Sequence, residues 1–319
     1  MLTRREAVIG VAAAGAVALL HRAQAFAAAP MPRTKVNFQV PPGACDCHVH
    51  INGDPKRYPM IPTRNFTPDV ATMEEMRQLF RALHIERAFI VQPSFYGTDN
   101  SCTLDQIQEL GIKNARGMAS VDLAKITDKE LDQLDRGGIR ALRVGLGPTV
   151  PEFTQRFQAL VQRLKGRKWH LNTNIPLSII DAVQDQVMAS PVPIALDHFA
   201  GLQASRGLEQ AGLATLLKLL KGGNVYVKLS RIHNISTQAP DYPDVVPLAK
   251  ALIAANPQRM LWGSDWPHAG AEPRKPISQI TPFVDVDDAH EFNMLPVWAP
   301  DPAQRKAILV DNPARLYGF

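Results

Sequence analysis

The sequence predicts an α/β fold in which eight parallel strands and their helices close into a single-domain (β/α)₈ TIM barrel. From residue 43 onward, short segments rich in strand-forming residues alternate with segments of helical periodicity. Such alternation indicates a parallel sheet, because parallel neighbours need a crossover connection. Eight strand candidates in a chain of 319 residues fit a closed barrel better than an open sheet. No internal repeat and no Gly-x-Gly-x-x-Gly run suggests another plan.

Each strand candidate is a short run with strand propensity, and amphipathic segments lie between the runs. The candidates are residues 44–51, 88–92, 115–121, 139–144, 170–175, 194–197, 225–229 and 260–263. One buried helical stripe is formed by Phe153, Phe157, Leu160, Val161 and Leu164. Thr72-x-x-Glu75 and Thr127-x-x-Glu130 are capping-box sequences, which predict that helices begin directly after these two threonines.

The irregular segment from residue 270 to residue 300 directly follows the last strand candidate. It holds five prolines and little periodicity. In a barrel, the loops after the strands surround the catalytic mouth, so we expect this segment to be a lid or a specificity loop. A surface insertion without a catalytic role is the alternative.

Charge and cysteine content bear on the class of protein. The formal net charge is +5, but the lysines and arginines are scattered, without a basic stripe that interleaves with aromatic residues, so we expect no nucleic-acid partner. The cysteines, Cys45, Cys47 and Cys102, are too few for a disulfide framework, so free and buried thiols are expected. A homo-oligomer is compatible with this composition.

The first 29 residues have the composition of an export signal. Arg4 and Arg5 precede an apolar stretch at residues 7–20, and the Ala-Gln-Ala of residues 23–25 matches an Ala-x-Ala cleavage site. The paired arginines indicate twin-arginine export to the periplasm. The apolar stretch is shorter than the ~20 residues of a membrane span, so no stable membrane anchor is expected, and an uncleaved anchor is the weaker alternative. Residues 30–319 then form the barrel domain.

Two histidines close the first strand candidate. In the segment Asp46-Cys47-His48-Val49-His50, alternation places Asp46, His48 and His50 on one face, with Val49 and the neighbouring cysteines on the other. If the apolar set packs against the helices, both histidines point into the barrel near its carboxyl-terminal mouth. A His-x-His pair on a strand is typical of a metal site or an acid–base site.

A third histidine and an aspartate follow two other strand candidates. His198 comes directly after the sixth candidate, and Asp265 follows the eighth. These side chains meet His48 and His50 only if the barrel closes, and such convergence is what an active site requires. A buried core histidine is the alternative for His198. We expect His268 to orient Asp265 or the substrate.

Five motifs in a fixed order carry a family resemblance. They are the Asp-x-His-x-His of residues 46–50, Asp197-His198, the Val-Tyr-Val-Lys-Leu-Ser of residues 225–230, the Trp-Gly-Ser-Asp-Trp-Pro-His of residues 262–268 and the tail at residues 311–319. Together they resemble the amidohydrolase superfamily, in its amidohydrolase-related (amidohydrolase 2) group. The lactonase-like branch, with 2-pyrone-4,6-dicarboxylate lactonase and galactarolactone isomerase, is the most similar. The resemblance implies a TIM barrel.

The resemblance also implies roles for single residues. The three histidines of the predicted site surround the reacting carbonyl, and the residue matching Asp265 acts as the base toward the attacking water. The residues matching Ser94 and Arg143 contact substrate oxygens. Further candidates for substrate contact are Tyr96, Asn174, Arg231 and His268. Arg143, with Arg231 or Lys228, would hold a substrate carboxylate through charge-assisted hydrogen bonds. Salt bridges at the barrel end are the alternative for these basic residues.

The metal content follows less directly from the resemblance. Binuclear relatives carry a bridging lysine or glutamate at the end of the fourth strand, and residues 139–145 contain neither. Mononuclear relatives carry a histidine at the end of the fifth strand, whereas His170 lies at its beginning. The three histidines and the aspartate of the predicted site would suit one divalent ion such as zinc, with an open position. We favour a metal-independent site that requires no cofactor.

The favoured function is hydrolysis of a lactone of a carboxylate or sugar acid. Asp265 would take a proton from water, and His198, with His48 or His50, would stabilise the developing oxyanion. The expected partner is therefore a small organic acid or lactone. Alternatives are lactone isomerisation, metal-dependent amide hydrolysis or decarboxylation, and a non-catalytic periplasmic binder of organic acids. A binder is disfavoured because it needs no poised base.

Overall fold

The structure is a computed structural model and describes residues 28–143, 145, 149–270 and 272–319. The export signal expected at residues 1–29 therefore lies, up to residue 27, outside the described residues. In the part of the chain that the structure describes, no helix is long and apolar enough to cross a bilayer.

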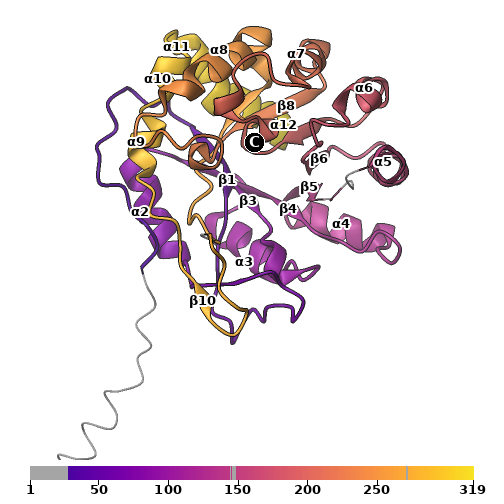
Figure 1. Cartoon of the computed structure of the whole chain (residues 1–319). Coiled ribbons are helices and arrows are strands. Elements are labelled where there is room, and N and C mark those ends of the chain that lie inside the picture. The colour runs from indigo at the N-terminus through magenta and orange to yellow at the C-terminus, as the bar shows by residue number, and fades with distance from the viewer. Residues whose placement is uncertain (1–27, 144, 146–148, 271) are drawn as a thin grey trace, which may run out of the picture.

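Eight parallel strands form one sheet in which each strand pairs with the next along the chain. Their bounds are β1 (Cys45–Val49), β3 (Arg87–Val91), β4 (Ala115–Ala119), β5 (Ile139–Arg143), β6 (His170–Thr173), β7 (Ile194–Leu196), β8 (Val225–Leu229) and β9 (Met260–Trp262). Helices follow the strands and form an outer ring (Figure 1). The predicted (β/α)₈ barrel in a single domain is therefore confirmed, and all eight predicted strands are present.

Two helices begin at the capping boxes that the sequence predicts. The bounds of the helices are α2 (Met73–Leu83), α3 (Ser101–Leu110), α4 (Asp128–Arg136), α5 (Val150–Leu164), α6 (Ile180–Met188), α7 (Leu213–Gly222), α8 (Val246–Ala255), α9 (Asp288–Phe292), α10 (Leu295–Trp298), α11 (Pro302–Lys306) and α12 (Asn312–Tyr317). Thr72 and Thr127 form the two predicted capping boxes, which start α2 and α4. The predicted apolar stripe lies on α5, and a third capping box, at Thr149, starts this helix.

Alternate strand residues pack into two separate hydrophobic clusters. One lies between the strands and the helices and includes Val49, whereas the other fills the barrel and includes Phe89. The C-terminal segment closes the amino-terminal end of the barrel: Asn312 Nδ2 donates to Met260 O at 2.8 Å, and Tyr317 stacks on Phe89 at 4.0 Å between ring centroids. Figure 1 shows this end of the chain at the centre of the ring.

The alternation expected along β1 is wrong. Cys45 and Cys47 belong to the cluster inside the barrel, whereas Val49 packs against the helices. The cause is a register shift in the pairing of β1 with β3 between Asp46 and Val49. An extra residue in one strand reverses the faces of the side chains that follow it. The shift therefore allows His48 to enter the barrel although its neighbour Cys47 does so too. All three cysteines are free and buried, as predicted.

The first and last strands of the sheet are joined through the segment that follows β9. Asp265 N donates to His48 O at 2.8 Å, and His50 N donates to Trp266 O at 2.9 Å. Gly263 permits this approach, because a Cβ at this position would lie 2.7 Å from both N and Cβ of His48. We call these contacts the seam. The seam closes the barrel and brings the His-x-His pair to Asp265.

Asp46 supports the seam and does not share the face of the two histidines. Its buried carboxylate accepts hydrogen bonds from His48 N at 3.0 Å, from Ser264 N at 3.1 Å and from Ser264 Oγ at 2.6 Å. Burial raises the pKa of Asp46 to about 7, although these hydrogen bonds lower it. Asp46 thus ties β1 to the segment after β9 from behind the site.

The segment at residues 270–300 contains more regular structure than its sequence predicts. It holds β10 (Ile280–Thr281), which pairs in parallel with β2 (Thr67–Pro68) from the segment after β1. The short helices α9 and α10 follow. Figure 1 shows β10 beside the early part of the chain. The segments after the first and last strands therefore support each other, and the role of a lid stays a prediction.

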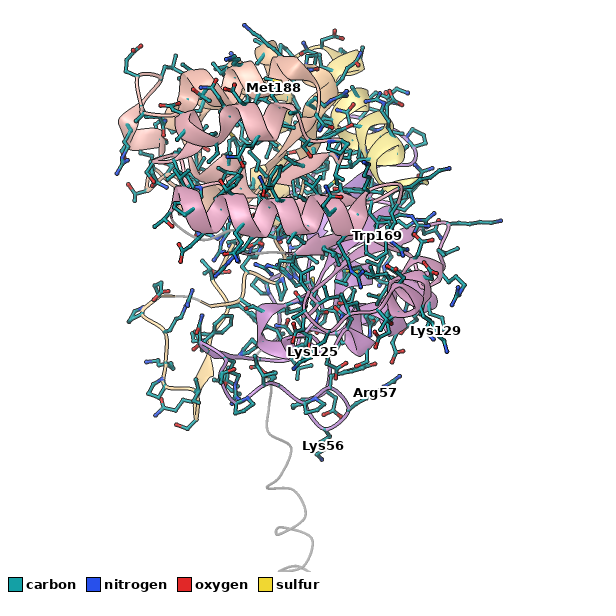
Figure 2. All side chains as sticks on the ribbon, turned by 90° about the vertical axis from the view of Figure 1, so that its right-hand side faces the viewer. Lys56, Arg57, Lys125, Lys129, Trp169 and Met188 are labelled. Carbon is teal, nitrogen blue, oxygen red and sulfur yellow. The ribbon has the colours of Figure 1, made fainter. Side chains whose placement is uncertain are left out.

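Basic side chains lie on separate parts of the outer surface. Figure 2 shows Lys56 and Arg57 on the segment after β1, and Lys125 and Lys129 near the start of α4. Arg57 pairs with Asp105 at 2.6 Å. The positive charge of the chain is thus distributed and locally paired in this region.

Gly263→Ala should destabilise the protein, because the added methyl group meets backbone atoms of His48 that cannot move without opening the seam. We expect the free energy of unfolding, measured by urea denaturation, to fall by about 1–3 kcal/mol, the usual effect of overpacking. Gly145→Ala is the matched control, since a Cβ at this exposed residue meets no atom within 4 Å. Equal stabilities of the two variants would contradict the role of Gly263.

Candidate active site

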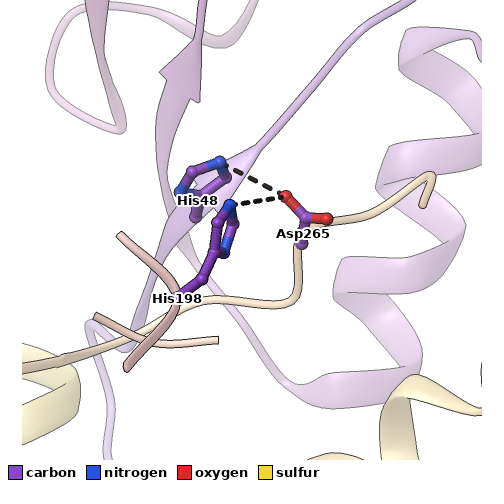
Figure 3. A group of neighbouring side chains, drawn as sticks. All are labelled: His48, His198 and Asp265. Carbon is purple, nitrogen blue, oxygen red and sulfur yellow. Dashed lines mark ion pairs between the residues drawn. The ribbon is translucent and has the colours of Figure 1, made fainter. Parts of the chain in front are cut away.

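The side chains predicted to be catalytic come together at the carboxyl-terminal mouth of the barrel. His48 and His50 lie at the end of β1, His198 follows β7, and Asp265 follows β9. Asp265 Oδ1 lies 3.3 Å from His48 Nε2 and 3.4 Å from His50 Nε2. The distance from this oxygen to His198 Nε2 is 3.8 Å. Figure 3 shows that His48 and His198 both point toward the Asp265 carboxylate. One carboxylate oxygen therefore faces three imidazoles.

The backbone of the site is strained at several positions. His198, Arg231, Asp265 and His268 have φ values of 51°, 58°, 70° and 60°. Left-handed backbone is sparsely populated by residues other than glycine, and it clusters at functional sites, where the surrounding structure must enforce it. In Arg231, this conformation accompanies a contact of Nε with Asp265 Oδ2 at 3.3 Å. Both oxygens of Asp265 thus have nitrogen neighbours.

The second ring nitrogen of each histidine has its own partner. His50 Nδ1 lies 2.8 Å from Val91 O, and His198 Nδ1 lies 3.0 Å from Ser230 Oγ. A carbonyl oxygen can only accept, so His50 carries a proton on Nδ1. When it is neutral, His50 therefore presents a lone pair on Nε2 toward Asp265.

His48 has two charged partners below the site. Its Nδ1 lies 3.2 Å from Asp197 Oδ1 and 3.4 Å from Lys228 Nζ. Asp197 also accepts a hydrogen bond from Asn172 Nδ2 at 2.7 Å. Lys228 is fully buried. A carboxylate and an ammonium thus compete for the same ring nitrogen.

Burial and charge together set the protonation of the site. Burial would by itself raise the pKa of Asp265, but the attraction of His198 and the charge of Arg231 hold this pKa well below its usual value of 3.8. Burial lowers the pKa of both His48 and His198 from 6.5. At neutral pH the site therefore contains an ionised carboxylate beside two neutral imidazoles.

Three of the predicted substrate contacts lie at or after the carboxyl ends of strands. Arg143, at the end of β5, donates from NH1 to Gln92 O at 3.0 Å. His50 Nδ1 donates to the carbonyl of Val91, the residue before Gln92. The Arg143 guanidinium therefore lies on the His50 side of the mouth. Ser94 and Asn174 are exposed residues after β3 and β6. Their roles stay predictions.

Other predicted contacts are buried and have protein partners. The Tyr96 hydroxyl accepts a hydrogen bond from Gly53 N at 2.9 Å. His268 lies 3.0 Å from Asp288 through Nε2, and its backbone N donates to the backbone carbonyl of Asp265. The expectation that Lys228 holds a substrate carboxylate is wrong, because its side chain has no exposed surface and pairs with acceptors inside the barrel.

Several residues behind the site were not assigned from the sequence. They are Asn172, Asp197 and Ser230, which contact the histidines or their partners. Strand alternation was the signal that points to two of them, because Asn172 and Ser230 lie two residues after His170 and Lys228, which also face the interior.

The spacing of three ligand atoms fits one divalent metal ion. His48 and His198 ring nitrogens and an Asp265 oxygen all lie within 4.8 Å of one another. The 3.3 Å between His48 and Asp265 equals the edge of ~3.3 Å expected for tetrahedral ligands about 2.0–2.1 Å from zinc. These three residues would hold such an ion only with the lone pair of His48 on Nε2, the nitrogen that faces Asp265. His170 packs against Phe89 inside the barrel, away from this group.

Comparison with known proteins confirms the family resemblance. A family model described as amidohydrolase matches residues 45–319. The chain is 33% identical to the 4-sulfomuconolactone hydrolase of Hydrogenophaga intermedia, over 89% of this chain and 91% of that protein. It is 30% identical to the 2-pyrone-4,6-dicarboxylate hydrolase of Comamonas testosteroni, over 89% of this chain and 93% of that protein. A crystal structure of an Agrobacterium tumefaciens protein shares the fold, with a TM-score of 0.73 at 24% identity, over 90% of this chain and 98% of that one.

Proposed function

The chain belongs to the amidohydrolase family, and from this premise we propose that it is a lactone hydrolase that opens the cyclic ester of an organic acid. The observation that carries the proposal is the convergence of three imidazoles and one arginine on the buried carboxylate of Asp265. Such a group can remove a proton and stabilise negative charge at the same place, which is what attack of water on an ester carbonyl needs. The two relatives described above are named as hydrolases of lactone-type substrates.

Asp265 is the base in this proposal. Its lowered pKa keeps it ionised at neutral pH, so it can take a proton from a water molecule at the mouth. His50 Nε2 lies 3.4 Å from the same oxygen and is an acceptor when His50 is neutral. Asp265 and His50 can therefore orient one water by its two protons.

His198 and His48 stabilise the oxyanion that forms on the carbonyl. Both are neutral at pH 7 because burial lowers their pKa values, and a neutral imidazole can donate one N–H. A divalent ion held by His48, His198 and Asp265 would supply the same polarisation of the carbonyl oxygen.

Basic residues at the mouth favour a substrate with an anionic group. Arg231 keeps part of its side chain exposed beside Asp265, and Arg143 lies near His50. A guanidinium binds a carboxylate or sulfonate through charge-assisted hydrogen bonds. The names of both relatives contain such groups, a sulfo group in one and two carboxylates in the other. We infer that the substrate is a small lactone with at least one carboxylate or sulfonate.

Asp265→Asn should abolish most of the activity on such a lactone. It keeps the size of the side chain but removes the proton acceptor, so kcat should fall at least ~100-fold. KM should change little, because the arginines remain. Arg143→Ala should raise KM more than it lowers kcat, since it removes a contact made in both ground and transition states. The assay is NMR detection of the ring-opened acid, with the exposed Asp185→Asn as the control.

Near-normal turnover by folded Asp265→Asn would refute Asp265 as the base. Conversion of the lactone into an isomeric lactone, without the open acid as the product, would replace hydrolysis by isomerisation.

The rate should be independent of pH between about 8 and 9, above the pKa of about 7 of Asp46, which supports the seam. Asp265 is ionised above its lowered pKa, and His48 and His198 are neutral above theirs, so none of the three changes charge in this range. The measurement is kcat at saturating substrate, corrected for spontaneous hydrolysis. A change of kcat with an apparent pKa between about 8 and 9 would contradict this assignment of charges.

We also propose that the protein is exported to the periplasm by the twin-arginine route, on the basis of Arg4, Arg5 and the Ala-Gln-Ala at residues 23–25. The position of cleavage can be narrowed by the contacts of the described residues. Ala29 is buried, and its N–H donates to Glu75 Oε1 at 3.2 Å. Trp266 Nε1, next to the base, donates to Pro30 O at 2.8 Å. Cleavage after residue 25 preserves both contacts.

The mature protein should therefore begin at Phe26 and retain Ala29, which intact-mass measurement of periplasmic protein can determine. Replacement of both Arg4 and Arg5 by lysine should prevent export, because the twin-arginine route reads the arginine pair. A mature chain that begins at Pro30 would contradict the proposed cleavage position. Normal periplasmic yield from the double-lysine variant would contradict the route.

A further inference from the structure

We propose that Lys228 is a positioning residue that holds the proton of His48 on Nε2, so that His48 is a hydrogen-bond donor in the site and a poor metal ligand. The inference deepens the proposed function and rests on it for the reaction. Its structural part, the tautomer of His48, does not depend on any substrate.

Lys228 lies inside the barrel on β8, where an ammonium is costly to bury without partners. Its Nζ lies 3.1 Å from Asp197 Oδ1 and 3.4 Å from His48 Nδ1. It also lies 5.2 Å from the centre of the Phe89 ring. An ammonium has three donors and no acceptor. The surroundings of Lys228 must therefore provide lone pairs.

His48 Nδ1 can provide one of these lone pairs only if it carries no proton. With a proton on Nδ1, an N–H dipole would point toward the Lys228 ammonium at 3.4 Å. Asp197 Oδ1, at 3.2 Å, is the competing partner that would favour a proton on Nδ1. The charge of Asp197 is already paired with the Lys228 ammonium at 3.1 Å, and its other oxygen accepts from Asn172 Nδ2 at 2.7 Å. The ammonium therefore decides the tautomer, and the proton of neutral His48 lies on Nε2.

The two histidines of the pair then have opposite tautomers. His50 carries its proton on Nδ1, because it lies 2.8 Å from the carbonyl oxygen of Val91. A metal ion binds the lone pair of a neutral ring nitrogen, and the other nitrogen normally donates to a carboxylate or carbonyl. His50 meets this condition and His48 does not.

The proposed tautomer suits the chemistry of an oxyanion donor. The Nε2–H of His48 points toward Asp265 Oδ1, 3.3 Å away, at the place where the reacting carbonyl must approach the base. Preorganised donors to an oxyanion are among the largest contributions to catalysis. Lys228 would act through His48, without touching the substrate.

The tautomer can be read directly by NMR. In protein labelled with ¹⁵N-histidine, long-range ¹H–¹⁵N correlation spectra distinguish a proton on Nε2 from one on Nδ1. The His48 signals are assigned by their loss in His48→Gln. We expect the Nε2–H pattern in the wild type and the Nδ1–H pattern in Lys228→Met, where Asp197 becomes the only charged partner. An Nδ1–H pattern in the wild type would overturn the proposal.

Zinc affinity gives a second readout that is independent of activity. Lys228→Met should bind Zn²⁺ at least ~10-fold more tightly than the wild type in chelator-competition titrations, in line with the effect of partners behind a metal ligand. Its kcat, measured in the presence of chelator, should fall at least ~10-fold with little change in KM. Lys221→Met, at an exposed position on α7, is the matched control and should change neither quantity. Unchanged zinc affinity in Lys228→Met would overturn the proposal.

Lys228→Met leaves Asp197 without its ammonium partner, which can prevent folding. In that case Lys228→Met/Asp197→Asn removes both charges and is measured instead. In the double variant, loss of the Nε2–H preference of His48 supports the proposal, and its retention overturns it. If the wild type shows the Nε2–H pattern but no panel of anionic lactones is hydrolysed, the proposed function fails and the tautomer assignment stands.

Discussion

The backbone pairing between the end of β1 and the segment after β9 is the constraint on which the rest of the structure depends. Asp265 N donates to His48 O, so the base and one histidine that it faces are joined by their own main chains. The same contacts close the barrel at the point where the sheet would otherwise have two free edges. Closure and site assembly are therefore one event: a molecule that has formed its barrel has also placed Asp265 against the histidines.

The register shift in β1 gives this strand two functions. Before the shift, Cys45 and Cys47 contribute small apolar side chains to the closed end of the barrel. After it, His48 lies in the polar layer with Asp197 and Lys228. In a regular strand, side chains alternate strictly, so Cys47 and His48 could not both point into the barrel. The barrel thus changes from an apolar floor to a charged middle layer and then to the open mouth.

Much of this arrangement could be predicted from the sequence, because its signals are local. Each of these signals is encoded by residues that are adjacent in the sequence: the strand runs, the capping boxes, and the strand ends that precede His198 and Asp265. The register shift could not be predicted, because it depends on how β1 pairs with β3, which lies about 40 residues later in the chain. The burial of Lys228 was missed for a related reason: a lysine at a strand end is usually exposed, and only the folded barrel shows that Asp197 and His48 surround it. The helices α9 and α10 are too short for periodicity to reveal them.

The strained backbone at His198, Arg231 and Asp265 has an evolutionary consequence. Each residue in a left-handed conformation costs on the order of 1–3 kcal/mol, while the net stability of a domain is only about 5–15 kcal/mol. Glycine would relieve the strain at any of these positions, but it would delete the imidazole, guanidinium or carboxylate on which the chemistry depends. Selection for greater stability and selection for turnover therefore oppose each other at the same three residue positions. Stabilising changes that preserve activity should accumulate in the helices and in the apolar layer around the barrel.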